Sequence, residues 1–510
     1  MAAFIVRRLF ASIFILLVAT YLMYVLTAFA GDPLEEIKQG NAPNKAALIE
    51  SRTKLLNLDV PVFLRYFLWL GGVLKCFIGQ CDLGVNVQAQ PVIVLLNQAA
   101  SSTIQLVTIA SVLAVTIGLI VGITTALRQY SGYDYGVTFL SFLFFSLPIF
   151  WVAVLLKQYV AIGFNDFLAK PTIEVWVIPV LAVVSGLIWM SIIPGRGPRK
   201  LIAFVGAAAL TAALIIYMQV TEWFNTPHIG IVGVAITAIG IAFGVTAIST
   251  GLKRRRALYA SLAVAVIGIA LHYPFMYYLS YLIEGWSFVV LGLVVLVVSF
   301  AVGWFAGGAD RAPIARTTAI TGMLVTAVIA IDRFMLVWSQ YANSGRIKGR
   351  PIATFGAFTP NLEGSLWVHG VDTFTHLLLP TLALILVSFA TYTRYSRASL
   401  LEVMNQDYIR TARAKGLTER TVVVRHAFRN ALIPIATIVA FDIGSLIGGA
   451  VITERVFGWS GMGQLFQNGL DRTDPNPVMA FFLVTGGLAI LFNLIADLAY
   501  AGLDPRIRVS

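Results

Sequence analysis

Residues 103–127 read TIQLVTIASVLAVTIGLIVGITTAL, a run of 25 residues without one charged side chain. An α-helix rises about 1.5 Å per residue, so about 20 apolar residues cross the roughly 30 Å hydrocarbon core of a bilayer. The run is therefore long enough to cross a membrane as a single helix, and it predicts one transmembrane span.

The composition extends this prediction to the whole chain. Of its 510 residues, 58% are hydrophobic and only 12% are charged, and the mean hydropathy is +0.85. Soluble domains carry about 25% charged residues. A soluble fold could not bury this excess without leaving large apolar patches in water. The composition therefore excludes a soluble globular protein.

Twelve apolar stretches have the length of a span, which predicts an all-α, polytopic membrane helix bundle of about 12 transmembrane helices. The ninth is the weakest, because Asp332 and Arg333 lie near its end. The stretches are 9–30, 103–127, 136–162, 174–194, 201–220, 229–250, 257–282, 286–306, 317–338, 371–393, 433–453 and 478–500.

The first stretch follows Arg7 and Arg8 and ends in Ala28-Phe29-Ala30, which is similar to a signal-peptidase site. Its apolar part, from Leu9 to Ala30, is longer than the roughly 7–15 residues of a secretory signal. We interpret it as a retained span.

Charge predicts the orientation of the spans. With the N-terminus inside, the inner segments hold 22 of the 36 Lys and Arg residues and only six acids. The positive-inside rule therefore favours a membrane protein with both termini in the cytoplasm. The net charge of +12 reports this topology and contact with anionic lipid, so it does not indicate nucleic-acid binding.

Residues 394–432 form the only long inner loop, and its pattern predicts a helix, a break at Gly416 and a second helix capped by Thr418. Small residues at 411, 412 and 414 precede the break and would let another protein approach closely. A solvated amphipathic loop with no partner is the alternative on physical grounds alone.

The loop sequence DYIRTARAKGLTERTVVVRHAFRNALIP resembles the cytoplasmic coupling loop of dipeptide/oligopeptide-type (peptide/nickel) permease subunits of ABC importers. Further similar motifs occur in order along the chain: STIQLVTIASVLAVTIGLIVGITTALR, SLPIFW, GGAVITERVFGWSGMGQL and NLIADLAYAGLDPRIR.

The resemblance predicts three regions. Residues 1–165 resemble core spans 1–3 with an external segment, and residues 371–510 resemble core spans 4–6 with the coupling loop 394–432. Residues 166–370 are predicted to be an inserted membrane region of about six spans plus an external loop. Six is even, so the insertion preserves the cytoplasmic side of the coupling loop. No role for the insertion follows from the sequence.

The resemblance implies a multi-pass permease subunit of a prokaryotic cytoplasmic membrane that moves di- or oligopeptides into the cytoplasm. Its implied partners are a homologous second permease subunit, two cytoplasmic ATPase subunits and an extracytoplasmic substrate-binding protein. The coupling contact with the ATPases is expected at Arg410, Thr411, Ala412, Arg413, Ala414, Lys415, Gly416, Leu417 and Arg425.

Four residues in the matched spans are candidates for the pore or gate. Asp442 and Asp497 are the deepest acids, and a charge within a membrane requires a partner or water. For Asp497, a structural hydrogen bond is the favoured interpretation. Gly444 and Gly448, like Gly118 and Gly122 in the second span, form small-xxx-small patterns that permit close helix crossing.

No enzyme site is predicted. The chain contains no G-x-x-x-x-G-K-[ST] phosphate loop, so no cofactor is expected here, and ATP and magnesium are expected on the partner ATPases. The five histidines lack metal-ligand spacing, so no metal site is predicted.

Cys76 and Cys81 lie in the predicted external segment, separated by Phe-Ile-Gly-Gln. An exported face is an oxidising environment, and Gly79 can supply a tight turn. A disulfide is therefore favoured, and two free, partly buried thiols are the alternative.

Three other functions stay open. Twelve spans are also typical of secondary transporters, although no two-fold repeat of spans is visible. A membrane scaffold or receptor is the second. Nickel or another small solute is the third, since permeases for such solutes share the same motifs.

Overall fold

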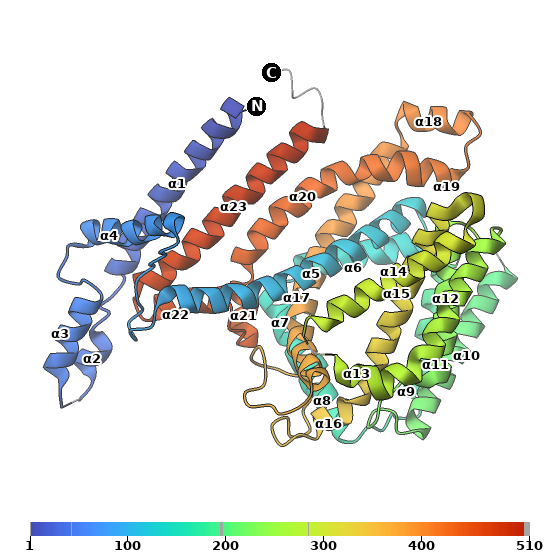
Figure 1. The fold of residues 1–510 in the computed structure, drawn as a ribbon, viewed down its shortest axis with the longest axis horizontal. Coiled ribbons are helices and arrows are strands. Elements are labelled where there is room, and N and C mark those ends of the chain that lie inside the picture. The colour runs from blue at the N-terminus through green and yellow to red at the C-terminus, as the bar shows by residue number, and fades with distance from the viewer. Residues whose placement is uncertain (1, 42, 194–196, 284, 504–510) are drawn as a thin grey trace. The chain divides into compact units, whose positions relative to one another are not determined.

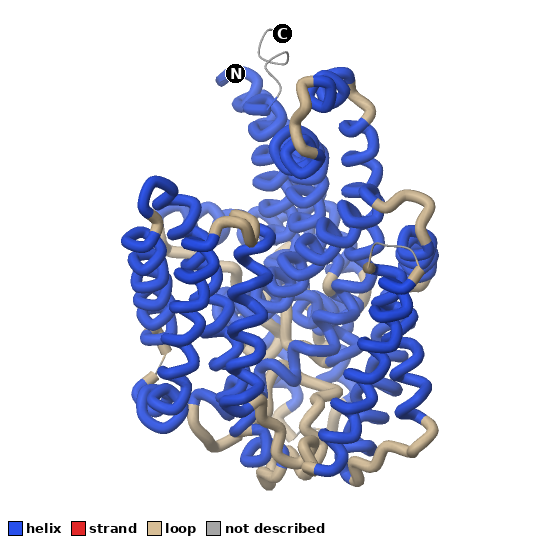
Figure 2. The backbone as a smooth tube through the Cα atoms, turned by 90° about the vertical axis from the view of Figure 1, so that its right-hand side faces the viewer, coloured by secondary structure: helices blue, strands red, loops and turns tan. Residues whose placement is uncertain are grey.

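A computed structural model describes residues 2–41, 43–193, 197–283 and 285–503. Within its helices, the side chains of residues 2–5, 420, 433, 437, 440, 441, 443–449 and 495–503 are not described. The described backbone is helical throughout, without a strand, and only Val85 and Pro91 form an isolated bridge (Figure 2). The prediction of an all-α, polytopic fold is confirmed.

Ten helices in the described residues are long and apolar enough to cross a membrane. An eleventh, Val177–Ile192, is apolar but shorter. The predicted span 433–453 overlaps helix Phe428–Gly449, many of whose side chains are outside the described set. The number twelve therefore stays a prediction.

The described chain separates into two compact units. Unit 1 contains residues 1–161, 354–357 and 376–510, and unit 2 contains residues 162–353 and 358–375. Unit 2 thus consists largely of the region that the sequence analysis assigns to the insertion.

Unit 1 holds the helices on either side of that region. In Figure 1, the start of α1, the end of α23 and the α18–α19 turn lie at one end of this unit, whereas α2 and α3 lie at the other. Its elements are α1 (Ala2–Phe29), α2 (Glu35–Gln39), α3 (Lys45–Leu55), α4 (Val62–Leu74), η1 (Lys75–Ile78), α5 (Val92–Leu127), α6 (Gly132–Ser146), α7 (Ile149–Leu155), η2 (Leu156–Ile162), α17 (Leu366–Met404), α18 (Asp407–Ala414), α19 (Glu419–Thr421), η5 (Val422–Ala427), α20 (Phe428–Gly449), α21 (Val451–Phe457), α22 (Met462–Asp471) and α23 (Pro475–Leu503). The last residue of η2 and the first residues of α17 belong to unit 2.

The predicted span 136–162 is wrong as a single helix. The chain leaves the helical conformation at Leu147, and a new helix begins after Pro148. Proline has no amide hydrogen, and it also disfavours a helical conformation in the residue before it. The segment is therefore built from α6, α7 and the π-helix η2.

Unit 2 is a set of helical hairpins. Neighbours α9–α10, α11–α12 and α14–α15 pack in pairs, and α15 also packs on α11 and α12. Its elements are α8 (Gly163–Ala169), α9 (Val177–Ile192), α10 (Pro198–Val220), α11 (Gly230–Ser249), α12 (Arg255–Pro274), η3 (Phe275–Leu279), α13 (Ser280–Leu282), α14 (Ser287–Ala306), η4 (Gly308–Asp310), α15 (Arg311–Leu336) and α16 (Trp338–Ala342).

Small residues bring the helices of unit 2 together. A Cβ on Gly303 would collide with Ala315 and Thr318 of α15, and one on Gly322 would collide with Ser299 of α14. Such contacts suit a bilayer, where close van der Waals packing drives helix association.

The charged pair that weakens the ninth predicted span is accommodated by contacts within unit 2. His272 Nε2 lies 2.8 Å from a carboxylate oxygen of Asp332, and the backbone N–H of Ile229 donates to the other oxygen at 2.6 Å. The Arg333 guanidinium stacks over the rings of Tyr281 and Trp367. Because these polar groups have partners, α15 continues unbroken to Leu336.

Candidate coupling site

The predicted coupling loop folds as two turns of helix, a sharp break and a capped restart. Helix α18 ends at Ala414, and Gly416 then adopts a φ of +75°, the left-handed region that glycine enters without strain. The Thr418 hydroxyl accepts a hydrogen bond from the backbone N–H of Thr421 and caps α19. The predicted glycine break and threonine cap are both present.

The structure changes the predicted second helix in one respect. Helix α19 comprises only Glu419–Thr421 and passes directly into the π-helix η5, before α20 begins at Phe428. π-Helical turns are rare and occur frequently at functional sites.

Helix α18 has an inner face that packs against unit 1. Ile409 and Ala412 are buried in a cluster with Leu400 of α17 and Val422 of η5, joined by Ala126, Ala427 and Ala431. The amide of Asn430 in α20 also donates to the Tyr408 hydroxyl at 3.0 Å. Helix α18 is therefore packed directly against the ends of α5, α17 and α20.

The outer face of the loop is exposed, and Ala412 does not belong to it. The prediction grouped Ala412 with an approach surface, but its side chain points into the buried cluster, where only a small residue fits. The exposed predicted residues are Arg410, Thr411, Arg413, Ala414, Lys415, Gly416, Leu417 and Arg425.

One ion pair closes the break on this exposed face. Arg413 Nη2 donates to Glu419 Oε1 at 2.7 Å and Arg413 Nε donates to Oε2 at 3.2 Å. The hydrogen bond from Arg413 holds the pKa of the Glu419 carboxyl below its usual value and raises the pKa of Arg413. A recess of about 620 Å³ opens beside this pair, between Ala126, Met404 and Val423.

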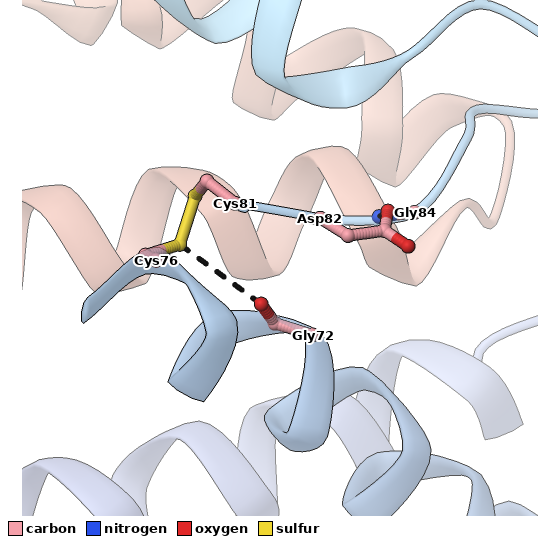
Figure 3. Close-up of a disulfide and its surroundings, with 5 residues drawn as sticks. All are labelled: Gly72, Cys76, Cys81, Asp82 and Gly84. Atoms are coloured by element: carbon pink, nitrogen blue, oxygen red, sulfur yellow. Dashed lines mark hydrogen bonds between the residues drawn. A yellow bond between two sulfur atoms is a disulfide. The ribbon is translucent and has the colours of Figure 1, made fainter. Parts of the chain in front are cut away.

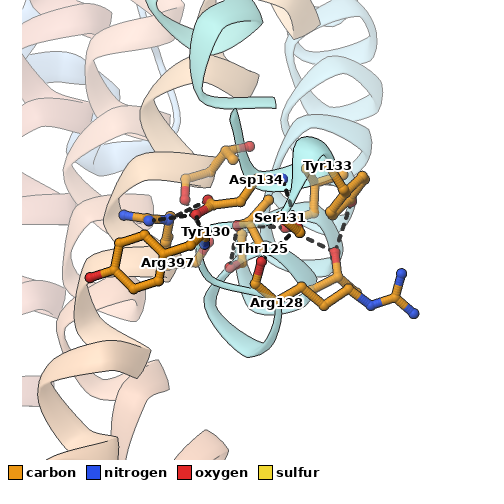
Figure 4. Close-up of polar contacts among 12 residues, drawn as sticks. Thr125, Arg128, Tyr130, Ser131, Tyr133, Asp134 and Arg397 are labelled. Carbon is orange, nitrogen blue, oxygen red and sulfur yellow. Dashed lines mark hydrogen bonds and ion pairs between the residues drawn. The ribbon is translucent and has the colours of Figure 1, made fainter. Parts of the chain in front are cut away.

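The sequence analysis did not predict a second ion pair, which lies at the same end of unit 1. Asp134, at the start of α6, is only 3% exposed, and it receives a bidentate contact from Arg397 of α17 at 2.9 and 3.0 Å (Figure 4). The backbone N–H of Tyr130 also donates to this carboxylate, and Ser131 caps α6. The partners are 263 residues apart, so no local pattern signals the pair.

The close crossing predicted for Gly118 and Gly122 is formed. A Cβ on Gly118 would collide with Tyr392 of α17, and one on Gly122 would collide with Ser396. The Ser396 hydroxyl donates to the Gly118 carbonyl at 3.1 Å. Helices α5 and α17 therefore meet backbone to backbone along this stretch.

The candidate gate residues are only partly described. Asp442 is half-buried in α20 and interacts with the hydroxyl of the fully buried Tyr392. Gly444, Gly448 and Asp497 fall within helices α20 and α23, but their side chains lie outside the described set. The structure thus gives Asp442 a partner, whereas the role of all four residues in a pore stays a prediction.

At the other end of unit 1, two buried carboxylates hold loops in place. Glu454 is fully buried, accepts from the Thr103 hydroxyl at 2.6 Å and accepts from the Gly463 N–H at 2.6 Å. Asp474 is 1% exposed and accepts from the Val87 N–H at 2.6 Å. Burial raises the pKa of Glu454, and it raises that of Asp474 to about 6.

The two cysteines, Cys76 and Cys81, form a disulfide in the structure (Figure 3). Gly79, between them, has the positive φ that the sequence analysis expects of a tight turn. The bridge closes the end of η1, next to the point where Asp82 Oδ1 accepts from the Gly84 N–H.

Comparisons with known proteins agree with the resemblance to peptide-type permease subunits. Residues 266–509 match the family model described as binding-protein-dependent transport system inner membrane component. The match begins within α12 of unit 2 and continues past the last described residue of α23, so it includes the whole coupling loop. It does not include the predicted core spans at 1–165.

Several curated permeases are similar to parts of the chain. The oligopeptide transport system permease protein OppB of Mycobacterium tuberculosis strain H37Rv is 44% identical over 155 residues, which are 30% of this chain and 48% of that protein. The dipeptide transport system permease protein DppB of Escherichia coli K12 is 42% identical over 197 residues, or 37% and 56% of the two chains. AppB of Bacillus subtilis 168, an oligopeptide permease, is 44% identical over 155 residues, or 30% of this chain and 48% of AppB.

The chain spans about half the length of the curated relatives it matches. The similarities agree with two features of the structure. These are the helical membrane fold and the break at Gly416. The chain is therefore similar to the dipeptide/oligopeptide-type permeases of ABC importers over part of its length, and its residues 266–509 match the binding-protein-dependent inner membrane component model.

Proposed function

We propose that this chain is a membrane-spanning subunit of an ATP-driven importer that moves di- or oligopeptides into the cytoplasm. The observation that carries the proposal is the construction of α18. One face of this helix is exposed beside a recess, and the other is buried against three helices of unit 1. This construction suits a part that receives force from another protein and transmits it to membrane helices.

In this mechanism, two cytoplasmic ATPase subunits bind and hydrolyse ATP with magnesium. Their movement displaces α18, and the buried contacts of Ile409 and Ala412 carry the displacement to α17 and α20. A second permease subunit would complete the pathway, and an external binding protein would deliver the solute. Rigid-body shifts of packed helices between two states are an established way to switch access.

The test of coupling separates the exposed face from the buried one. Ala414→Trp adds bulk to the exposed face and leaves the buried cluster intact, so we expect normal thermal stability with loss of solute-stimulated ATP hydrolysis in the reconstituted complex. Gly416→Pro should abolish the same activity, because proline cannot adopt a positive φ.

Gly251→Ala is the matched control for Gly416→Ala. Both glycines have a positive φ, and a Cβ added to either would meet open space, but Gly251 lies in a turn of unit 2. Strain at both sites should be similar, about 1–2 kcal/mol, and only Gly416→Ala should weaken coupling. Wild-type transport by Ala414→Trp and Gly416→Pro would refute the coupling role of the loop.

The proposed orientation places α18 in the cytoplasm. Single cysteines at 255 and 406, in a background without Cys76 and Cys81, should resist an impermeant thiol reagent in intact cells, whereas one at 356 should react. Labelling of position 406 from outside would refute the orientation.

The substrate class has its own experiment. Competitive uptake of dipeptides, oligopeptides and nickel by the reconstituted complex should show preference for peptides. Preference for nickel would keep the permease mechanism and replace the proposed solute.

A further inference from the structure

Unit 2 contains an apolar cavity that no step of the proposed transport uses. The cavity has a volume of about 490 Å³, within the roughly 300–1,000 Å³ range of ligand pockets. Its walls are almost entirely apolar and come from α8, the α10–α11 loop, α15, α16 and the start of α17. A cavity of this kind suits a hydrocarbon chain and offers a polar solute no hydrogen-bonding partner.

Aromatic rings form one wall of the cavity. Phe167 packs edge-to-face on Phe224 with ring centroids 5.0 Å apart, and Phe224 packs in the same way on Trp223 at 5.6 Å. Trp338 and Phe334 contribute from α16 and α15. The edge-to-face contacts hold Trp223 and Phe224 in place at the wall of the cavity, with Phe167 packed behind them.

Tryptophans at the helix ends of unit 2 indicate that the cavity lies near a membrane–water interface. Four tryptophans occur at the same ends of the alternating helices of unit 2: Trp176 precedes α9, Trp223 follows α10, Trp286 precedes α14 and Trp338 begins α16. Tryptophan is enriched at the headgroup level of membrane proteins. We therefore expect the cavity to be within reach of the tail of an adjacent lipid.

A polar hollow of about 540 Å³ adjoins the apolar cavity and shares three of its walls, Leu168, Phe224 and Trp338. Two cations, Lys348 and Arg350, line this hollow, and Asp166 is the one acid among its lining residues. In the described part of the chain, neither cation has an ion-pair partner. The hollow therefore presents a net positive charge beside an apolar cavity.

The segment that carries these cations is held in place. Buried Asn165 of α8 donates to the Ile352 carbonyl at 2.8 Å and accepts from the Ile352 N–H at 2.9 Å. The Gly349 N–H donates to the Ala342 carbonyl, and the Tyr341 hydroxyl donates to the Pro351 carbonyl. The positions of Lys348 and Arg350 are thus fixed relative to the cavity.

We propose that unit 2 binds one anionic phospholipid, with an acyl chain in the apolar cavity and the phosphate in the hollow at Lys348 and Arg350. Charge complementarity and the continuity of the two spaces carry this inference. The proposal does not depend on which solute the protein transports.

Native mass spectrometry of the full chain in detergent tests the proposal. Dioleoyl-phosphatidylglycerol and dioleoyl-phosphatidylcholine share their tails, so a difference in retention reports the headgroup. We expect one phosphatidylglycerol to remain per chain at concentrations where phosphatidylcholine is lost. Equal retention of both lipids would indicate ordinary annular lipid and overturn the proposal, as would retention of inorganic phosphate without lipid.

Two pairs of variants sharpen the test. K348Q with R350Q should weaken phosphatidylglycerol retention roughly tenfold or more, whereas K170Q with R346Q removes two exposed cations outside the hollow and should have no effect. Leu168→Trp should fill the shared wall and expel the lipid, whereas Val175→Trp places the same ring on an exposed residue. Unchanged retention in both test variants would refute the site even if one of them alone folded poorly.

Discussion

The two polar ends of unit 1 use their charged residues in opposite ways. At the end with α18, Arg410, Arg413 and Glu419 are exposed, with side chains 71%, 42% and 59% accessible. At the end with α21 and α22, Glu454 and Asp474 are buried and bound to backbone N–H groups. Exposed charges on α18 are available to another protein, whereas the buried carboxylates stabilise the chain's own loops.

The largest loss of stability is expected from a substitution of Glu454. Glu454→Ala leaves Thr103 and the Gly463 N–H without their acceptor, and each orphaned buried donor costs about 1–3 kcal/mol, so the loss should total roughly 2–6 kcal/mol. Thermal unfolding of the purified chain measures it. Glu50→Ala is the control, because Glu50 is an exposed glutamate in α3, and equal effects of the two changes would remove the contrast between the ends.

The second-largest loss of stability is expected at Asp134, which is a buried carboxylate at the α18 end of unit 1, where the other charges discussed are exposed. Arg397→Gln leaves buried Asp134 without its bidentate partner, and breaking a buried pair costs about 3–5 kcal/mol. Because Arg397 is about one-third exposed, we expect a smaller loss, about 2–3 kcal/mol. Chemical unfolding measures the loss. Asp134→Asn with Arg397→Gln should restore part of it, and a double variant less stable than Arg397→Gln would contradict the assignment.

The third prediction concerns pH at the α22 end. Burial raises the pKa of Asp474 from 3.8 to about 6, so the folded state binds its proton more tightly than the unfolded state. The free energy of unfolding should therefore increase as pH falls from about 6 toward 4, by at most about 2–3 kcal/mol from this group. Unfolding at several pH values, compared between wild type and Asp474→Asn, measures it. Asp474→Asn should lose the increase in stability between about pH 6 and pH 4. Identical pH profiles of the variant and wild type would contradict the assignment to Asp474.

The smallest effect on stability is expected at the exposed pair of α18. Arg413→Gln should cost less than about 1 kcal/mol, because exposed ion pairs contribute about 0.2–1 kcal/mol and are screened by salt. Its effect on solute-stimulated ATP hydrolysis should nevertheless exceed that of Arg52→Gln, an arginine of α3. A large loss of stability in Arg413→Gln would show that both ends use their charges structurally.

Local patterns predicted the features that depend on a few neighbouring residues. Apolar runs identified the membrane helices, Gly416 identified the break in the loop, and Thr418 identified the cap. The small-residue spacing of Gly118 and Gly122 predicted a close crossing, although the spacing could not name α17 as the partner helix. These features follow from hydrogen bonding and backbone sterics within a few turns of chain.

Features that join distant segments were not predictable in this way. Helical spacing places Ala412 on the same face of α18 as Ile409 and Ala414 on another, but only the docking of α18 on α17 and η5 decides that the Ile409 face is buried. The pairs Asp134–Arg397 and Thr103–Glu454 are separated by 263 and 351 residues.

The sequence by itself determined that this chain is a polytopic helical membrane protein whose loop breaks at Gly416 and resembles the coupling loop of peptide-type permeases. Hydropathy over about 20 residues and backbone conformation at single glycines are local properties, so they can be read without coordinates. The tertiary structure alone decided which charges are buried, which face of α18 is exposed, and that an apolar cavity and two cations of unit 2 share walls. Those properties depend on which distant helices pack together, because burial and partner distance exist only after the chain has folded.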